Sequence, residues 1–176
     1  MYLDTILLIE KPMSQIWIVE NDALQLGSIR SKLGLAFPSF ELIPVRTEHE
    51  FRELLCSHRA PNAVSLVVLD IFLPWSLPGP NIATPPDDIA REGFRAFERA
   101  GYRCVKLLAE NDLTQGVPVV LYTQLDRPLV SRDLTELPES VQYFRKEAGH
   151  NALVDAINHA LAGRGRREAN WINRGD

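Results

Sequence analysis

Five short runs of aliphatic and β-branched residues recur along the chain, separated by stretches with helical spacing. The runs cover residues 16–19, 40–45, 64–69, 117–122 and 141–144. This alternation predicts a mainly parallel sheet with helices on both faces, the α/β class. One domain over residues 16–162 accommodates all five runs.

The stretches between the runs predict five helices. A polar side chain at Asn21 or Asp22 caps the first, which is expected to end before Gly34. The third is the longest, with an expected core stripe of Phe94, Phe97, Val105 and Leu108 and a weakened or kinked point at Gly101. The expected spans are 22–33, 48–57, 89–110, a short helix within 124–140, and 151 to about 162, capped by Asn151.

Three segments depart from the alternation. Prolines crowd residues 74–88 and predict an irregular insertion at 75–88. Residues 1–15 form an N-terminal extension, in which 5–9 is either an added edge strand or another register for the first strand. Residues 163–176 carry four arginines and are expected to be a basic, solvated tail.

Composition narrows the choice of function. The 176 residues carry a formal charge of −4, which gives no general attraction for nucleic acid, so direct nucleic-acid binding is not expected. No apolar run reaches the 18 residues of a membrane span, and the first ten residues lack the basic start of a signal peptide. A cytoplasmic protein without membrane contact is the expectation. Cys56 and Cys104 lie far apart and predict neither a disulfide framework nor a zinc site.

Polar residues follow four of the five apolar runs. The carboxyl ends of parallel strands meet at one edge of a sheet, where ligands bind. A carboxylate there can accept a phosphoryl group, provided that cations offset the charge. Acidic and amide oxygens suit Mg²⁺, and a lysine supplies a second cation. In chain order these residues are Glu20, Asn21 and Asp22, then Asp70, Thr123 and Lys146.

Four motifs together resemble the receiver domain of bacterial two-component response regulators. They are IWIVEND at 16–22, LVVLDIFLP at 66–74, VPVVLYT at 117–123 and YFRK at 143–146. The resemblance implies a flavodoxin-like, doubly wound five-stranded parallel sheet of order 2-1-3-4-5, which is the strand order known for receiver domains.

The resemblance also implies roles for the motif residues. Asp70 would be the phospho-acceptor, assisted by Thr123 and Lys146, and Mg²⁺ would bind to Glu20, Asn21 and Asp70. Thr123 and Tyr143 would form a switch that alters a protein-binding face. A histidine kinase or phosphotransfer protein would donate the phosphoryl group, and a downstream target protein would read the switch; dimer formation is left open.

Departures from the family pattern leave a second function open. Asn21 stands where the family usually has an acid, which should lower metal affinity, and Glu147 follows Lys146 where proline is usual. The insertion could gate the site, add Asp87 and Asp88, or dock a partner. The leading hypothesis is a stand-alone receiver without enzymatic turnover, and the alternative is a degenerate receiver that binds proteins independently of phosphorylation. A hydrolase that uses Asp70 as a transient nucleophile is disfavoured. A second acid two residues after Asp70 could serve as its general acid, but Phe72 stands at that position.

Overall fold

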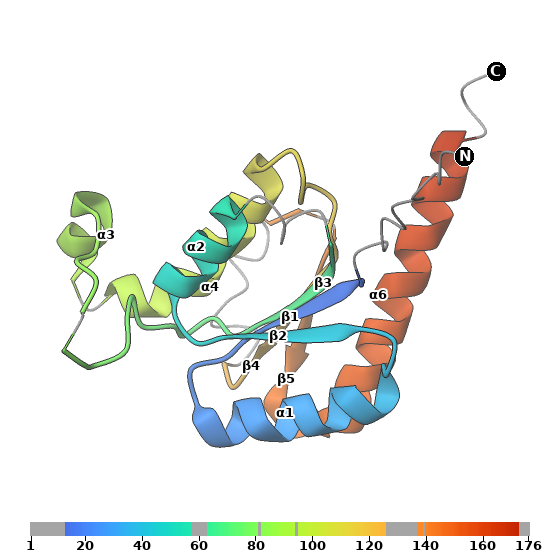
Figure 1. Ribbon diagram of the computed structural model, residues 1–176, viewed down its shortest axis with the longest axis horizontal. Coiled ribbons are helices and arrows are strands. Elements are labelled where there is room, and N and C mark those ends of the chain that lie inside the picture. The colour runs from blue at the N-terminus through green and yellow to red at the C-terminus, as the bar shows by residue number, and fades with distance from the viewer. Residues whose placement is uncertain are drawn as a thin grey trace, which may run out of the picture.

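The computed structural model describes residues 13–57, 63–80, 82–93, 95–125, 137, 138 and 140–172, with only the backbone described for 164–172. Five parallel strands form one sheet of order β2-β1-β3-β4-β5 (Figure 1). The strands are β1 (Gln15–Val19), β2 (Glu41–Val45), β3 (Val64–Leu69), β4 (Val119–Thr123) and β5 (Val141–Arg145). The predicted fold class and strand order are confirmed, and each strand begins within two residues of its predicted start.

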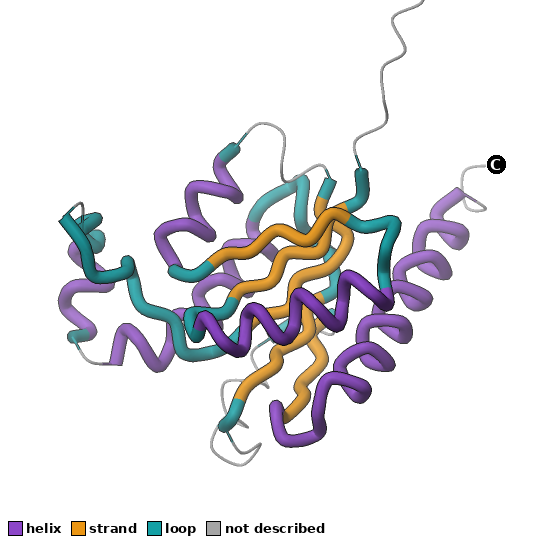
Figure 2. The backbone as a smooth tube through the Cα atoms, turned by 60° about the horizontal axis from the view of Figure 1, so that its bottom comes forward, coloured by secondary structure: helices purple, strands orange, loops and turns teal. Residues whose placement is uncertain are grey.

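Helices cover both faces of the sheet (Figures 1 and 2). One face packs against α1 (Ala23–Ala36) and α6 (Gly149–Ile172), and the other against α2 (Glu48–Cys56) and α4 (Arg95–Glu110). The short α3 (Asp87–Glu92) and the 3₁₀ turn η1 (Lys146–Ala148) complete the described elements. None of the described helices is long and apolar enough to cross a membrane.

The sheet has one hydrophobic core on each face. Successive residues of a strand pack alternately into the two cores, because side chains of a strand point to opposite faces in turn. In β1, Ile16 and Ile18 pack on the α1 and α6 side, whereas Trp17 and Val19 pack on the α2 and α4 side. All four are at most 1% exposed. β1 is therefore buried on both faces, which explains its uninterrupted apolar run.

The helix expected over 89–110 is in fact two helices. Gly93 adopts a positive φ of 57° and ends α3, after which α4 begins at Arg95. The expected core stripe is only partly correct: Val105 and Leu108 are buried, but Phe97 is 37% exposed and stacks on Phe72 at 5.5 Å between ring centroids. Phe94 lies outside the described residues.

Gly101 is not a kink but a point of close contact. Helix α4 continues through it, and its amide donates to the Ile71 carbonyl at 2.9 Å. A Cβ at this position would lie 2.6 Å from both the Asp70 carbonyl oxygen and the Ile71 Cα, closer than atoms pack. Only glycine lets α4 approach the loop that carries Asp70.

Other helix limits differ from the expectations. Asp22 caps α1 as predicted, but the helix continues past Gly34 to Ala36. The last helix begins at Gly149, two residues before the expected cap, and extends to Ile172, so much of the predicted tail is helical. The strand-like run at 5–9 and most of the expected helix within 124–140 lie outside the described residues.

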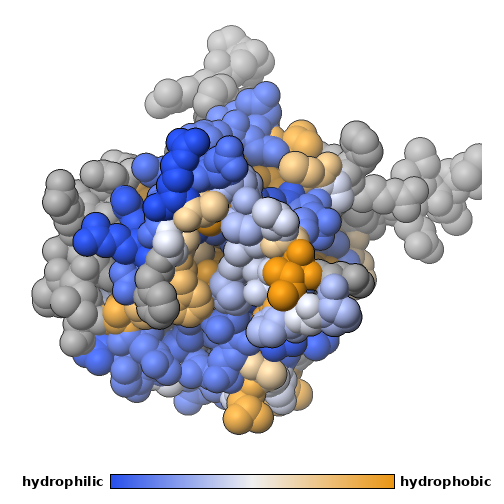
Figure 3. All heavy atoms as spheres, turned by 90° about the vertical axis from the view of Figure 1, so that its left-hand side faces the viewer, coloured by the Kyte–Doolittle hydropathy of each residue, from blue (hydrophilic) through white to orange (hydrophobic). Residues whose placement is uncertain are grey.

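The proline-rich insertion is anchored to the start of α2. The amides of Glu48 and His49 donate to the carbonyls of Pro74 and Trp75, each at 3.0 Å. The Trp75 ring also stacks on His49, with 5.3 Å between centroids. Figure 1 shows the insertion and α3 projecting beyond α2 and α4, and Figure 3 shows mixed hydrophobic and hydrophilic atoms on this side.

Candidate functional site

The carboxyl ends of β1 and β3 position two carboxylates side by side. The Asp70 amide donates to the Val19 carbonyl at 2.9 Å, and the Glu20 amide donates to the Val45 carbonyl, also at 2.9 Å. These bonds continue the strand ladder for one residue beyond each strand, so the backbone that carries both side chains is held by the sheet.

Lys146 joins the two carboxylates from the end of β5. Its Nζ lies 2.5 Å from Asp70 Oδ2 and 2.6 Å from Glu20 Oε2. The side chains of Glu20, Asp70 and Lys146 are only 3%, 8% and 9% exposed. The structure thus brings together three residues that the sequence placed at one sheet edge, and their chemical roles remain predictions.

The remaining carboxylate oxygens accept backbone hydrogen bonds. Glu20 Oε1 accepts from the Asp22 amide at 3.0 Å, and Asp70 Oδ1 accepts from the Ile71 amide at 2.6 Å. Asp22 uses Oδ1 to cap α1, accepting from the amides of Leu24 and Gln25. One oxygen of the Asp22 carboxylate is therefore used to cap the helix.

Thr123 and Tyr143 both bond to the backbone of one residue, Leu125. Thr123 is fully buried at the end of β4, and its Oγ1 accepts from the Leu125 amide at 3.4 Å. The half-buried Tyr143 on β5 donates its hydroxyl to the Leu125 carbonyl. The two predicted switch residues are thus connected through Leu125.

Burial, hydrogen bonds and neighbouring charges together set the pKa values of Glu20 and Lys146. Burial raises the pKa of Glu20 above its usual 4.5; the Lys146 hydrogen bond opposes this rise and the charge of Asp70 adds to it. Burial lowers the pKa of Lys146, but attraction to Asp70 and hydrogen bonds to both carboxylates outweigh it, so the pKa lies above 10.5. Lys146 is therefore a fixed cation at neutral pH.

The donor set fits the predicted Mg²⁺ poorly. Mg²⁺ usually binds through one or two carboxylates and several waters. Each oxygen of Glu20 and Asp70 already accepts a hydrogen bond, two of them from Lys146. Asn21 offers only a neutral amide, and the described part of the chain holds no metal-binding group of three acidic, histidine or cysteine side chains. Mg²⁺ stays a prediction from the resemblance.

Arg46 belongs to the same edge, although the sequence pattern did not single it out. It directly follows β2, and its Nη2 donates to the Asn21 carbonyl at 3.3 Å. The criterion that selected Glu20 and Asp70, a polar residue just after an apolar run, also applies to Arg46. Pro44 makes the β2 run less regular, which weakened that signal.

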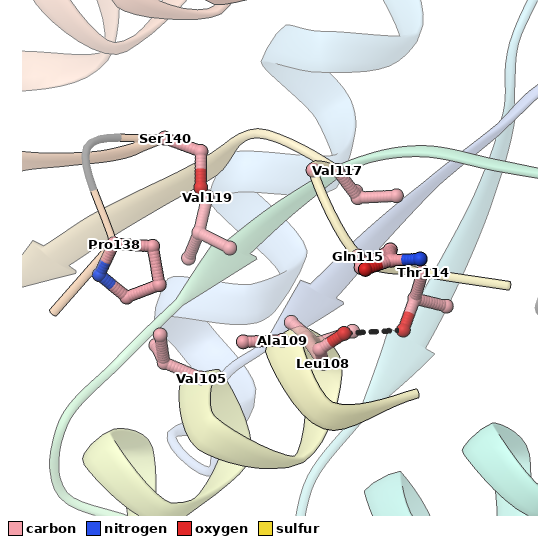
Figure 4. A pocket seen from close by; sticks show the side chains of 10 residues that line it. Val105, Leu108, Ala109, Thr114, Gln115, Val117, Val119, Pro138 and Ser140 are labelled. Carbon is pink, nitrogen blue, oxygen red and sulfur yellow. Dashed lines mark hydrogen bonds between the residues drawn. The ribbon is translucent and has the colours of Figure 1, made fainter. Parts of the chain in front are cut away.

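Two cavities lie at opposite ends of the sheet. One of about 440 Å³ opens beside Lys146, between α1 and the start of α6, where Tyr122 and His150 also line it. The other, of about 400 Å³, lies near the start of β4, between Val105, Leu108 and Val119 (Figure 4). Because β4 runs from Val119 towards the site, only the first cavity adjoins the carboxylate cluster.

Comparisons with solved structures agree with the topology. A response regulator receiver protein from Sinorhizobium medicae superposes with a TM-score of 0.61 at 20% identity, covering 86% of this chain and 96% of that one. The signal receiver domain of a histidine kinase from Syntrophus aciditrophicus gives 0.60 at 19%, covering 85% and 91%. A response regulator receiver domain from Clostridium thermocellum gives 0.60 at 15%, covering 86% and 97%.

No protein-family model matches the sequence, and no curated protein matches it. The structural likeness therefore establishes the fold: a flavodoxin-like, doubly wound parallel sheet. More specifically, it is the fold of response regulator receiver domains.

Proposed function

We propose that this chain acts as a receiver that accepts a phosphoryl group on Asp70 from a histidine kinase or phosphotransfer protein. One observation carries the proposal: Lys146 Nζ lies 2.5 Å from Asp70 Oδ2 at the carboxyl edge of the sheet. An ammonium this close to the accepting carboxylate can neutralise charge on an incoming phosphoryl oxygen. The chain then acts as a substrate and a switch, without turnover of its own.

The transfer is a substitution at phosphorus. A carboxylate oxygen of Asp70 supplies an electron pair to phosphorus, and the bond from phosphorus to the donor breaks. From a phosphohistidine the leaving group is the imidazole, which keeps the electron pair of the broken P–N bond. From acetyl phosphate the leaving group is acetate, and no proton moves.

The cavity beside Lys146 supports an approach by a donor protein. It is lined by exposed Leu24 and half-buried Gln25 from α1 and by His150 from α6. A donor side chain entering there would reach Lys146, which also lines this cavity. One structural neighbour is a receiver domain of a histidine kinase, and another is the BeF₃-activated DrrB receiver domain.

The backbone of Leu125 supports the proposed switch. Thr123 accepts a hydrogen bond from its amide and Tyr143 donates one to its carbonyl, so a movement of either side chain affects the backbone of the same residue. A phosphoryl oxygen on Asp70 that accepts a hydrogen bond from the Thr123 hydroxyl would draw this side chain away from the Leu125 amide. The proposed readout is a change of the surface around β5 that a target protein recognises.

Labelling with radioactive acetyl phosphate tests the function directly. Wild type should incorporate label, Asp70→Ala should incorporate none, and Lys146→Met should be slower by on the order of 100-fold. Asp22→Ala, which removes a helix cap from the same edge, is the matched acidic control and should still be labelled. Labelling with no dependence on Asp70 would contradict the proposal.

A degenerate receiver that binds proteins without phosphorylation is the second candidate. The observation that favours it is the neutral Asn21 together with the direct contact of Lys146 with both carboxylates. Binding of a captured partner that is equal for wild type and Asp70→Ala, with no labelling of either, would select this function.

A further inference from the structure

Arg46 lies at the same edge of the sheet as Asp70, beyond the end of β2. Strand β1 lies between β2 and β3, so Arg46 and Asp70 flank the end of β1 from opposite sides. The guanidinium reaches over that end and donates through Nη2 to the carbonyl of Asn21, the neighbour of Glu20. The contact is with the backbone of Asn21, the residue that is neutral where the family pattern usually has an acid.

The Arg46 guanidinium has donor capacity that the described protein does not use. Its Nε is buried and has no hydrogen-bond acceptor in the described part of the chain, and the guanidinium forms no ion pair there. A buried donor without an acceptor costs free energy. An arginine fork matches the oxygens of a phosphate geometrically, so an anionic ligand would satisfy it.

Lys146 and Arg46 supply two cations at this edge. Its acids are Glu20 and Asp70, which contact Lys146, and Asp22, whose Oδ1 accepts from the first amides of α1, whereas Asn21 is neutral. A phosphoryl group on Asp70 would add negative charge at this edge, which the ammonium and the guanidinium can offset. Two fixed cations can supply the stabilisation that phosphoryl transfer requires.

We infer that Asp70 accepts and holds a phosphoryl group without a divalent metal, with Lys146 and Arg46 as the two cations. This inference rests on the proposed function and specifies its chemistry. The carboxylate oxygen of Asp70 forms the new O–P bond, the bond to the leaving group breaks with its electron pair, and both cations keep their protons throughout.

The experiment measures the rate of labelling by radioactive acetyl phosphate in excess EDTA and in excess Mg²⁺. Wild type should be labelled at rates within about threefold of each other under the two conditions. In EDTA, Arg46→Gln should be slower by on the order of 100-fold, the usual effect of removing one stabilising donor. Arg46→Lys, which keeps the charge but not the fork, should be intermediate.

Controls separate charge, folding and metal effects. Arg30→Gln removes an equal charge from the exposed side of α1 and should leave the rate in EDTA unchanged. Asn21→Asp supplies the carboxylate that Mg²⁺ prefers and should be labelled faster with Mg²⁺ than in EDTA. Circular dichroism confirms that each variant is folded.

The outcomes distinguish the two hypotheses. Asp70-dependent labelling that requires Mg²⁺ and is insensitive to Arg46→Gln overturns the inference and leaves the proposed function intact. No Asp70-dependent labelling under either condition overturns both. Labelling in EDTA that depends on both Asp70 and Arg46 supports both.

Discussion

Glu20 makes the stability of the fold depend on pH. Because its pKa is raised above 4.5, chiefly by burial, the folded protein holds this proton more tightly than the unfolded chain does. Its contribution to the free energy of unfolding is therefore largest below pH 4.5 and declines as pH rises through the folded pKa. Glu20→Gln removes this dependence.

The expected result is that the unfolding free energy of Glu20→Gln, relative to wild type, increases between about pH 4 and about pH 7. Urea unfolding at several pH values measures the difference. Glu98→Gln changes an exposed glutamate of α4 and is the control, and its unfolding free energy relative to wild type should not follow the trend of Glu20→Gln. A difference that does not change with pH would contradict the prediction.

Glu48 is a buried charge that does not contact Lys146 and is important for stability. It is fully buried, and its carboxylate lies 2.8 Å from Arg52 Nη2 and 2.6 Å from Arg103 Nη2. Glu48→Ala would leave a partly buried Arg103 without this partner and should lower the free energy of unfolding by about 3 kcal/mol. Glu53→Ala, with a 68% exposed side chain, should change it by less than about 0.5 kcal/mol. Equal losses in urea unfolding would refute this role of Glu48.

The positions of site residues were predictable where they depended on strand order, and unpredictable where they depended on contacts between helices. Asp70, Glu20 and Lys146 each follow an apolar run, so a parallel sheet alone brings them to one edge. Glu48 looks in the sequence like an ordinary first-turn acid, because its partner Arg103 lies 55 positions away. Only the packing of α2 on α4 reveals that pair.

At the scale of elements, the approach of α4 to the Asp70 loop depends on Gly101. Gly101→Ala should lower the free energy of unfolding by about 2 kcal/mol, because overpacking against Asp70 and Ile71 outweighs the gain in helix propensity. Gly27→Ala is the matched control: no atom lies within 4 Å of a Cβ at Gly27, so the same change in α1 should stabilise by about 1 kcal/mol. Thermal or urea unfolding of both variants checks the opposite signs, and stabilisation by both would be incompatible with the close contact.

The insertion is held to α2 by Trp75, and loss of its ring should loosen that attachment. The Arg52 guanidinium lies 5.5 Å from the centroid of the Trp75 ring. The backbone carbonyl of Trp75 accepts a hydrogen bond from the His49 amide. Trp75→Ala should accelerate hydrogen exchange of the His49 amide about tenfold, given the usual energy of aromatic stacking. Trp75→Phe keeps an aromatic ring and should change the rate less. An unchanged rate in Trp75→Ala would show that the backbone bonds alone hold the insertion.

Element boundaries could be predicted from helix caps and from periodicity. A break inside an amphipathic stretch could not be predicted in this way. Asp22 identified the start of α1, since a short acid before an apolar pattern is a strong cap signal. The break at Gly93 was missed because the apolar spacing continues from Ile89 into α4. Gly101 was misread because a glycine that weakens a helix and one that permits close packing look the same in a sequence.

For the whole molecule, the parallel sheet turns separate segments into one site. Glu20, Asp70 and Lys146 are separated by 50 and 76 positions, yet their side chains are in contact because β1, β3 and β5 all end at the same edge. A ligand bound at this edge would contact the ends of several strands at once. Its binding should therefore stabilise the fold as a unit and not only the local loops.

A phosphoryl mimic should accordingly raise the melting temperature of the entire domain. A ligand that binds only the folded state at about 100 times its Kd adds about 2.7 kcal/mol, and a domain of this size gains roughly 2–4 °C per kcal/mol. BeF₃⁻ should therefore shift the Tm of wild type upwards by roughly 5–10 °C, measured by circular dichroism or calorimetry. Asp70→Ala lacks the carboxylate that coordinates beryllium and should show no shift, whereas Arg30→Gln should shift like wild type. An equal shift in Asp70→Ala would mean that the anion stabilises the fold from another place, and the phosphoryl site would then have to be sought away from Asp70.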